Sequence, residues 1–337
     1  MSKRSSSPAR AVVDAARRAD RKALAALLAQ GADLNGAWRG YRALHALLQE
    51  EPHAAGARAG KERLACLRWL LAHGADPELP GAWPPARALL VAAFAGEPAH
   101  VALLRERGAK VDFFVRCALG ELPQVKKELL RSPALARERD GGTLTALHCV
   151  AASRLGHADP KTARKLLAIA EWLLDAGADP NATAQSWSHE VDASYFACGS
   201  AQPEMLDLLL ARGADATAAL PSAAWRKTME LAEICLAHGA KVDAAHAEGR
   251  PLLNELVRWG QVTPALWLLE KGADPNLPDA RGWTAVHQAA SRGNERMMRA
   301  ILAAGGDRTK LDLQGLPPWK VAMLARKPKM MELLASG

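Results

Sequence analysis

Three histidines stand in similar local sequences of this chain, and one of them is followed directly by a cysteine. His148 precedes Cys149, while His45 and His287 follow the same kind of short apolar sequence. A histidine beside a cysteine could activate a nucleophilic thiolate, but such a pair also needs a third group that orients the ring and donors that bind an oxyanion. The sequence points to neither group. We therefore do not interpret His148 and Cys149 as catalytic.

The cysteines argue against two further kinds of site. They are odd in number, widely spread and without C-x-x-C spacing, and they are Cys66, Cys117, Cys149, Cys198 and Cys235. This is not the pattern of a disulfide framework or of a structural zinc site. The signatures G-x-x-x-x-G-K-[ST], G-x-S-x-G and H-E-x-x-H are also missing from the sequence. We expect no catalytic residues, no metal and no cofactor, and hence no enzyme.

The element that positions these residues is clearest in residues 272–307. Thr284 is expected to cap a short helix, and Gly293 suits the left-handed residue that ends it. A second helix follows, with an apolar stripe around Met298 and an end at Gly305. The sequence therefore predicts a helix hairpin with an extended turn on one side.

Copies of this hairpin run along the chain. A glycine followed by alanine, and usually by aspartate or lysine, recurs at intervals of about 33 residues, with one double step and one short step. The members are Gly31, Gly74, Gly108, Gly177, Gly213, Gly239 and Gly272, and Gly305 continues the series. One hairpin cannot bury both of its faces, so a fixed period indicates that neighbouring copies stack.

The sequence resembles the ankyrin-repeat family over essentially the whole chain. The markers are G-A-D-x-N closings at residues 31–35, 177–181 and 272–276, and x-A-L-H or T-A-V-H openings at residues 43–45, 145–148 and 284–287. The resemblance implies an all-α solenoid of about ten stacked helix-turn-helix units, curved, with short extended or β-hairpin-like fingers. It also implies that His45, His148 and His287 are structural, each ring bonding the backbone of the adjoining turn.

We expect the repeats to fill the chain and to leave no room for a further domain. Residues 1–8, rich in Ser, Lys and Arg, are predicted to be a disordered leader. Residues 9–337 are predicted to form a single array, with an N-terminal cap at 9–35, internal repeats at 36–309 and a C-terminal cap at 310–337. The outer face of a terminal repeat meets water, so polar residues are expected there.

Several repeats are irregular. The double step hides a degenerate fourth repeat at residues 111–139, and the seventh repeat is short where a finger would be, so we expect a gap in the row of fingers. Insertions are predicted at residues 49–60 and 155–160. Such insertions usually map to loops on one side of an array.

Tryptophan recurs in one position of the second helices. Trp69, Trp172 and Trp267 each precede a closing glycine by the same interval, which indicates packing between neighbouring repeats. Trp319 takes the place of leucine in the last opening and is expected in the core. Three lysines of the last repeat fit a polar cap, and they are Lys320, Lys327 and Lys329.

The charge balance leaves a second function open. The formal net charge is +8 at pH 7, which favours nucleic acid or an anionic surface as a partner. The charges nevertheless alternate in sign along most repeats and form no long basic block, as expected where Arg solvates the outer faces of Ala-rich helices. Binding of nucleic acid or of an anionic surface is therefore the alternative interpretation.

No apolar run of the sequence approaches the roughly 18 residues of a membrane span, and no apolar signal core follows Met1. We expect a cytoplasmic protein that does not contact membranes. The bias towards Ala and Arg fits a GC-rich coding sequence and hence a bacterial source.

The resemblance places fingers and first helices on the concave side, where partners bind. Aromatic residues at finger positions, one tryptophan in a loop after a first helix, and nearby arginines form the candidate site. They are Trp38, Tyr41, Trp187, Arg250, Arg258, Trp259, Arg281, Trp283 and Arg292. Exposed Trp and Arg are common interface hot spots. We therefore expect a monomeric scaffold that binds an acidic and apolar protein or peptide.

Overall fold

The structure is a computed structural model that describes residues 7–49, 56–81, 85–185, 190–226, 229–246 and 249–335. It divides into two compact parts, the N-terminal part (residues 1–200) and the C-terminal part (residues 201–337). Most of the expected leader, residues 50–55 of the first insertion and the candidate residue Trp187 lie outside the described residues.

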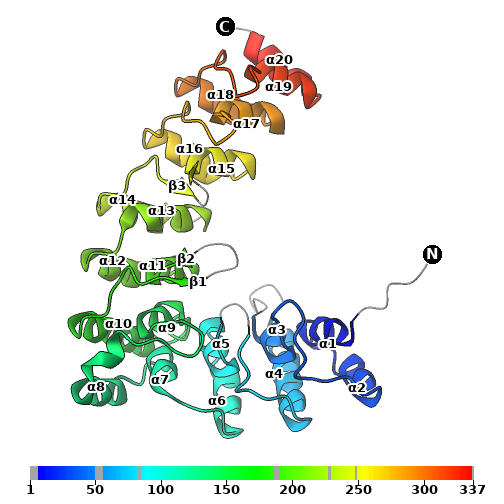
Figure 1. Ribbon diagram of the computed structural model, residues 1–337, viewed down its shortest axis with the longest axis vertical. Coiled ribbons are helices and arrows are strands. Elements are labelled where there is room, and N and C mark those ends of the chain that lie inside the picture. Colours follow the sequence, from blue (N-terminus) through cyan, green and yellow to red (C-terminus); the bar gives the residue numbers. More distant parts are fainter. Residues whose placement is uncertain are drawn as a thin grey trace. The chain divides into compact units, whose positions relative to one another are not determined.

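The N-terminal part consists of helix pairs (Figure 1). The first helices of its pairs are α1 (Pro8–Arg17), α3 (Ala43–Gln49), α5 (Ala88–Ala95), α7 (Phe113–Leu119), α9 (Ala146–Ala152) and α11 (Ala193–Gly199). The second helices are α2 (Arg21–Ala29), α4 (Gly56–Ala72), α6 (Pro98–Glu106), α8 (Leu122–Arg131) and α10 (Pro160–Asp175). A short 3-10 helix, η2 (Pro133–Ala136), follows α8.

The C-terminal part continues the same order of elements. It begins with α12 (Pro203–Ala211), the second helix of the sixth pair, and its first helices are α13 (Ala216–Trp225), α15 (Leu252–Arg258), α17 (Ala285–Arg292) and α19 (Pro318–Leu324). The remaining second helices are α14 (Met229–Ala237), α16 (Val262–Glu270), α18 (Glu295–Ala303) and α20 (Pro328–Ala335). The described residues thus contain the ten helix pairs that the period predicts.

Glycines and acidic caps set the limits of several helices. Gly96, Gly120 and Gly293 end α5, α7 and α17 in the left-handed region, with φ of 74°, 71° and 79°. Glycine adopts this conformation at little cost. At the start of α7 the side chain of Asp112 accepts a hydrogen bond of 3.0 Å from the amide of Val115. The predicted helix end at Gly293 is confirmed.

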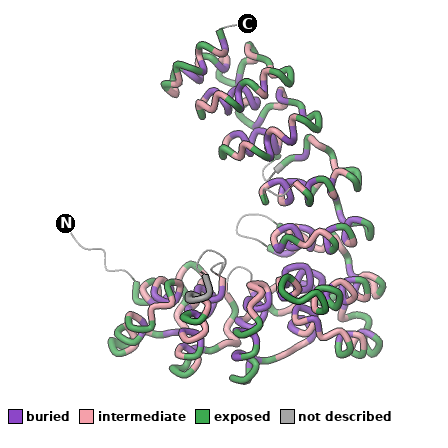
Figure 2. The backbone as a smooth tube through the Cα atoms, turned by 180° about the vertical axis from the view of Figure 1, so that it is seen from behind, coloured by how far each residue is buried: buried purple, intermediate pink, exposed green. Residues whose placement is uncertain are grey.

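Within each part the helices stack in two layers. In the N-terminal part α1, α3, α5, α7, α9 and α11 pack in that order, while α4 packs on α6 and α8 on α10. In the C-terminal part α15, α17 and α19 pack in order, and α16, α18 and α20 form the second layer. Figure 2 shows buried residues along the helices of both parts. Most of these residues are Leu and Ala, whose small and medium side chains allow close stacking.

The fingers are short and extended. β1 (Ala184–Gln185) pairs antiparallel with β2 (Glu190–Val191), with Ala184 opposite Val191. β3 (Ala245–His246) pairs in the same way with β4 (Arg250–Pro251). Isolated bridges mark two further fingers, between Trp38 and Tyr41 and between Arg139 and Thr145.

The irregular repeats have the elements that the sequence predicts, except at the first insertion. The degenerate fourth repeat is the pair α7 and α8, and η2 replaces the closing glycine. In the seventh repeat Asp215 caps α13 two residues after Gly213, so no finger precedes the helix. The first insertion was expected to run to residue 60, but α4 already begins at Gly56. Its last residues are therefore helical.

Two of the recurring tryptophans contact the second helix of the preceding repeat. The ring of Trp172 lies 4.7 Å from Nζ of Lys126 on α8. Nε1 of Trp267 donates a hydrogen bond of 2.9 Å to Oε1 of Glu233 on α14. Trp69 is half-buried on α4. The packing role predicted for this position is confirmed at Trp172 and Trp267.

Trp319 is not a core residue, contrary to expectation. Its side chain is 44% exposed. It lies on α19, which packs on α17 but has no helix against its other side among the described residues. The sequence repeats the pattern of an internal opening here, whereas burial depends on a neighbouring repeat.

Candidate functional site

The three repeated histidines bond backbone, two of them in a neighbouring finger and one at the start of its own helix. His45 donates from Nε2 to the carbonyl oxygen of Ala86 at 2.8 Å, and Nε2 of His287 lies 3.2 Å from the carbonyl oxygen of Leu316. In α9, Nδ1 of His148 accepts a hydrogen bond of 3.0 Å from the amide of Thr145. These contacts to backbone confirm the structural role expected for the histidines.

Burial makes His148 and Cys149 poor candidates for nucleophilic chemistry. It lowers the pKa of His148 to about 4, with Arg139 adding to the effect. It also raises the pKa of the Cys149 thiol well above its ordinary range. A thiol that stays protonated and sealed in the core is not a nucleophile. The pair fits packing and hydrogen bonding.

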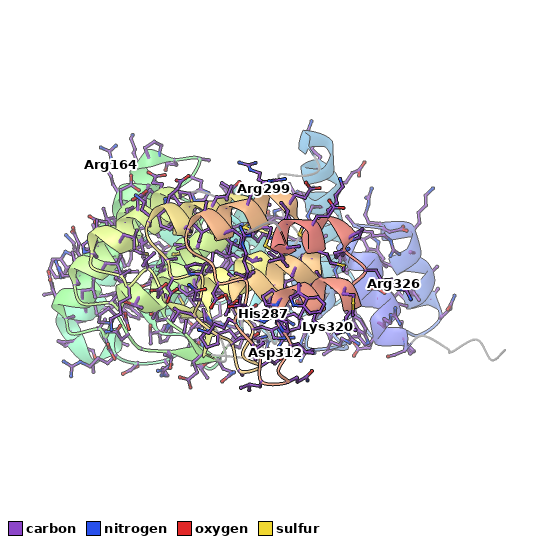
Figure 3. All side chains as sticks on the ribbon, turned by 90° about the horizontal axis from the view of Figure 1, so that it is seen from above. Arg164, His287, Arg299, Asp312, Lys320 and Arg326 are labelled. Carbon is purple, nitrogen blue, oxygen red and sulfur yellow. The ribbon has the colours of Figure 1, made fainter. Side chains whose placement is uncertain are left out.

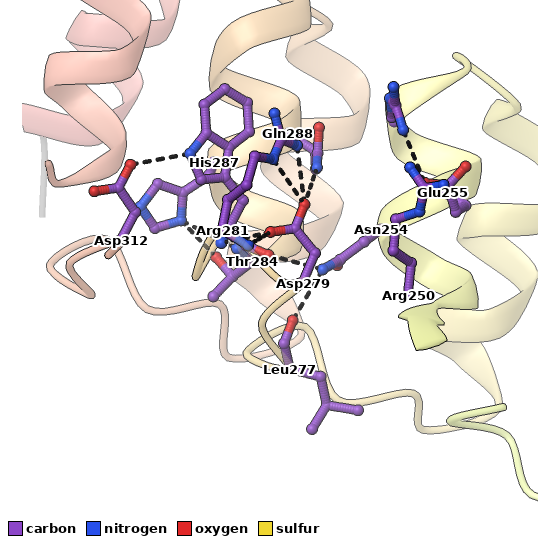
Figure 4. Close-up of polar contacts among 12 residues, drawn as sticks. Arg250, Asn254, Glu255, Leu277, Asp279, Arg281, Thr284, His287, Gln288 and Asp312 are labelled. Carbon is purple, nitrogen blue, oxygen red and sulfur yellow. Dashed lines mark hydrogen bonds and ion pairs between the residues drawn. The ribbon is translucent and has the colours of Figure 1, made fainter. Parts of the chain in front are cut away.

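A buried carboxylate organises the polar surface of the eighth repeat (Figure 4). Oε1 of Glu255 lies 3.2 Å from Nε of Arg250 and 3.2 Å from Nη1 of Arg258. Its Oε2 accepts a hydrogen bond of 3.0 Å from Nε1 of Trp259. Arg258 also lies over the Trp259 ring, 5.6 Å from its centroid. We call these four residues the Glu255 cluster.

In the ninth repeat, a second buried carboxylate accepts hydrogen bonds from several neighbouring residues. Oδ2 of Asp279 accepts hydrogen bonds from Nη2 of Arg281 at 2.9 Å and from Nε2 of Gln288 at 3.2 Å. Its Oδ1 accepts from the amide of Trp283 at 3.0 Å. The guanidinium of Arg281 stacks 4.1 Å from the centroid of the Trp283 ring. We call these residues the Asp279 cluster.

Hydrogen bonds also join the eighth, ninth and tenth repeats. Nδ2 of Asn254 on α15 donates to the carbonyl oxygens of Leu277 and Trp283, both at 2.9 Å. Nε1 of Trp283 donates to Oδ2 of Asp312 in the last finger at 2.9 Å. Asn254 thus bonds a neighbouring finger, as His45 and His287 do elsewhere.

Two segments of this chain match models of known protein families, and one solved structure resembles its fold. A family model for the ankyrin repeat matches residues 144–185, and a model described as ankyrin repeats in many copies matches residues 265–302. The solved structure of the human ASB11 ankyrin repeat domain superposes on 68% of this chain and 99% of that domain, with a TM-score of 0.52 and 21% identity.

The chain is an ankyrin-repeat protein. Its fold is the all-α ankyrin solenoid with short extended fingers. Among curated proteins it is 38% identical to inversin of Gallus gallus over 86 residues, which are 26% of this chain and 8% of inversin. It is 37% identical over 109 residues to ankyrin repeat protein nuc-2 of Neurospora crassa, covering 32% of this chain and 10% of that protein. This chain therefore matches only about a tenth of these relatives' length.

The ankyrin geometry brings together five of the nine predicted site residues. Arg250, Arg258 and Trp259 belong to the Glu255 cluster, and Arg281 and Trp283 to the Asp279 cluster. Trp259 is 57% exposed. Trp283 is half-buried and its indole N–H is already used by Asp312, so its position also supports the contact between repeats.

The other predicted residues lie apart from these clusters. Trp38 and Tyr41 form a β-bridge in the finger of the second repeat. Cζ of Arg10 lies 5.3 Å from the centroid of the Trp38 ring, and Cζ of Arg17 lies 5.5 Å from that of the Tyr41 ring. Arg292 is exposed at the end of α17. No hydrogen bond or ion pair within the described ranges joins Arg292 to either cluster.

Two exposed leucines of the last ankyrin finger were not predicted. Leu311 is exposed and Leu313 is 78% exposed, on either side of the buried Asp312. The amide of Leu313 donates a hydrogen bond of 3.0 Å to the carbonyl oxygen of Arg281 in the preceding finger. The alternation Leu-Asp-Leu would have shown this arrangement, because side chains of extended backbone alternate between two faces.

The described residues also bear on metal binding and on membrane insertion. No group of three or more His, Cys, Asp or Glu side chains in the described ranges is placed to hold a metal ion. None of the helices in those ranges is both long enough and apolar enough to span a membrane.

Proposed function

We propose that this ankyrin-repeat protein is a non-catalytic scaffold that binds a protein or peptide partner through the surface of its fingers and first helices. Ankyrin repeats generally mediate contacts between proteins. We call the proposed site the finger surface, and its members in the eighth to tenth repeats are Arg250, Arg258, Trp259, Arg281, Trp283, Leu311 and Leu313. The observation that carries the proposal is the Glu255 cluster, which holds an exposed tryptophan between fixed charges.

The Glu255 cluster supports binding because its side chains are already ordered. Hydrogen bonds to an ionised group are stronger than neutral ones. Glu255 accepts such bonds from Trp259 and Arg258 and forms an ion pair with Arg250. A partner then orders few side chains when it binds, which lowers the entropy cost of association. Trp and Arg held in this way are the residue types that dominate interface energies.

The charges and the exposed leucines of the finger surface indicate which kind of partner would fit it. Two arginines share the single carboxylate of Glu255, so this cluster has one positive charge in excess. Leu311 and Leu313 add exposed apolar area in the last finger. The finger surface therefore suits a segment with carboxylates and apolar side chains. Trp38, Tyr41, Trp187 and Arg292 remain proposed as further contact residues.

A peptide selection tests this function. Ligands are selected from a random peptide library on the wild-type protein, and their affinities are compared for Trp259→Ala and for a control, Leu130→Ala, which changes a 72% exposed leucine of α8. We expect acidic and apolar peptides, with Trp259→Ala costing about 2 kcal/mol, or about thirtyfold in Kd. Leu130→Ala should leave Kd unchanged. Peptides whose Kd is the same for both variants would show that the finger surface is not the binding site.

A further inference from the structure

The finger of the second repeat carries two aromatic rings that lie against arginines of the first repeat. Trp38 and Tyr41 exchange backbone hydrogen bonds of 2.9 and 3.0 Å across a tight turn. Arg10 and Arg17 of α1 lie over these two rings, and α1 itself packs on α3. Figure 3 shows the side chains that project from the helices of the first repeat, drawn in blue. The finger and α1 thus form one surface between the first and second repeats.

An arginine occupies the tip of this finger. Arg39 and Gly40 form the turn, with φ of 49° and 78°, and a type I′ turn requires positive φ at both positions. Asparagine, aspartate and glycine are usual at the first position, because left-handed backbone is costly for most other residues. Arg39 is exposed, and its Cζ lies 5.0 Å from the centroid of the Trp38 ring. The turn does not favour an arginine here, which points to a use for its side chain.

Arg10 and Arg39 bring positive charge that the neighbouring carboxylate does not offset. Asp14 of α1 lies 3.2 Å from Nη1 of Arg17 and 3.5 Å from Nε of Arg10. Its single charge balances one of these two arginines. No carboxylate of the described residues pairs with Arg39. Three arginines and one carboxylate therefore leave two positive charges in excess around the two rings.

The other charged residues of the loop between α2 and α3 offset one another. Arg42 donates hydrogen bonds to the carbonyl oxygens of Asn35 and Pro80. Asp33 accepts a hydrogen bond of 2.8 Å at Oδ1 from the amide of Asn35. One guanidinium and one carboxylate add no net charge, so the excess stays with the arginines at the rings. We call Arg10, Trp38 and Arg39 the Trp38 site.

Two guanidinium groups at one ring suit an oxyanion with two charges. An arginine held over an aromatic ring is ordered by that contact, while it retains N–H donors for an anion. Guanidinium binds phosphate through two parallel hydrogen bonds. A phosphate monoester on serine or threonine carries a charge of about −1.5 to −2 at pH 7, whereas a carboxylate carries only one charge. The excess charge of the Trp38 site therefore matches a phosphate monoester better than a carboxylate.

We propose that the Trp38 site binds the phosphate group of a phosphorylated serine or threonine in a protein partner. Arg10 and Arg39 hold the phosphate beside the Trp38 ring, and Arg17 keeps Asp14 occupied. This inference rests on the proposed scaffold function and adds to it a contact that depends on modification of the partner. Charge gathered at one ring suits a single dianion. A nucleic-acid strand instead carries its charges along its length and needs a row of cations.

The test uses a library of peptides with one fixed phosphoserine between random residues. Peptides that the full chain retains are identified, and fluorescence anisotropy measures Kd for a retained phosphopeptide and for its counterparts with serine or glutamate in place of phosphoserine. We expect the phosphopeptide to bind at least about tenfold more tightly than either counterpart. Absence of binding up to about 1 mM phosphopeptide would overturn the proposal. An equal Kd for either counterpart would also overturn it.

Substitutions in the finger separate binding from folding. Arg39→Asn removes the guanidinium and supplies a residue that the turn favours, so the variant should resist urea at least as well as the wild type. It should weaken the phosphopeptide by about tenfold or more, and so should Arg10→Gln. The control Arg131→Asn removes the same charge from an exposed arginine of α8 and should leave Kd unchanged. Equal losses for Arg39→Asn and Arg131→Asn would contradict a site at Trp38.

Trp259→Ala distinguishes the Trp38 site from the finger surface. This variant should bind the phosphopeptide like the wild type. If Trp259→Ala weakens the phosphopeptide and Arg39→Asn does not, the peptide occupies the Glu255 cluster, and the inference is wrong while the proposed function stands. If Arg39→Asn abolishes phosphopeptide binding but no unphosphorylated peptide responds to Trp259→Ala, the Trp38 site is supported and the finger surface is not the binding site.

Competition with a single-stranded oligonucleotide tests nucleic acid as the occupant. We expect the oligonucleotide to displace the phosphopeptide poorly. An oligonucleotide that binds at least as tightly as the phosphopeptide, and that Arg39→Asn also weakens, would assign the Trp38 site to nucleic acid and contradict a phosphorylated protein partner.

Discussion

The three repeated histidines connect elements through hydrogen bonds to backbone, and burial favours their neutral form. His45 and His287 bond backbone of a following finger, and His148 bonds the backbone at the start of its own helix. Burial lowers the pKa of all three rings. A fourth buried ring, His100 on α6, has its pKa lowered to about 4 by burial and by Arg63.

We predict that acid destabilises the N-terminal part through His100 and His148. Their pKa of about 4 in the folded protein lies below the value near 6.5 expected for unfolded chain. The folded state therefore binds fewer protons, and stability falls as the pH drops from 7 towards 4. Each ring should contribute a loss of about 2 kcal/mol between pH 7 and 5.

Urea unfolding at a series of pH values measures this loss. His100→Gln should flatten the pH dependence, and the same substitution at His73, an exposed histidine of the same part, serves as the comparison. A pH dependence that is the same in both variants would contradict the role given to His100.

Residues whose position recurs in register could be predicted from the sequence. The histidines and Trp172 recur at fixed places, and their contacts repeat with the period. Trp319 could not be placed in this way, because it takes the position of the buried Val286 and yet is exposed. The contacts of Glu255 with two arginines could not be predicted either, because they depend on the folded positions of Arg250 and Arg258.

At the scale of elements, the helix hairpin was predictable wherever its glycine and its apolar stripe survive. The hidden pair of α7 and α8 kept the stripe and lost only the closing glycine, so its helices were predicted. The start of α4 at Gly56 was missed, because residues between a first and second helix carry no periodic signal that distinguishes loop from helix.

The burial of α12 leads to a stability prediction. Leu209 is fully buried and Leu208 is half-buried on the same helix. Leu209→Ala should cost about 2 to 5 kcal/mol, because truncation leaves a cavity, and Leu208→Ala should cost distinctly less. Denaturant unfolding of both variants checks the order. A larger loss for Leu208→Ala would show that the buried side of α12 is assigned wrongly.

The seventh repeat should be the least stable repeat of the C-terminal part. α13 has no finger, and Pro221 within it removes a backbone donor. Stability in an array is a sum over neighbouring contacts, so a repeat with fewer contacts opens first. Hydrogen exchange should be faster for the amides of α13 than for those of α17. Equal protection of the two helices would contradict this prediction.

At the scale of the whole molecule, the net charge of +8 bears on the alternative function, which is binding of nucleic acid or of an anionic surface. The Glu255 and Asp279 clusters together hold three arginines and two carboxylates, so they carry only one positive charge in excess. The basic composition was visible in the sequence. The pairing was not, because it depends on residues brought together by the fold.

We therefore predict weak binding to nonspecific duplex DNA. Measured by anisotropy at increasing salt, any affinity should be low and fall little with salt, since few phosphates are neutralised. An affinity with a steep linear dependence of log K on log salt would favour the alternative function, in which the basic charge binds nucleic acid.

Affinity capture from the protein's own cell lysate tests whether the finger surface binds a protein partner. Wild type, Trp259→Ala and the control Leu130→Ala are used as bait with and without nuclease, and the retained proteins are identified by mass spectrometry. We expect a discrete protein partner that survives nuclease, is retained by Leu130→Ala and is lost with Trp259→Ala. A partner that nuclease removes, and that Trp259→Ala retains, would contradict a protein-binding finger surface.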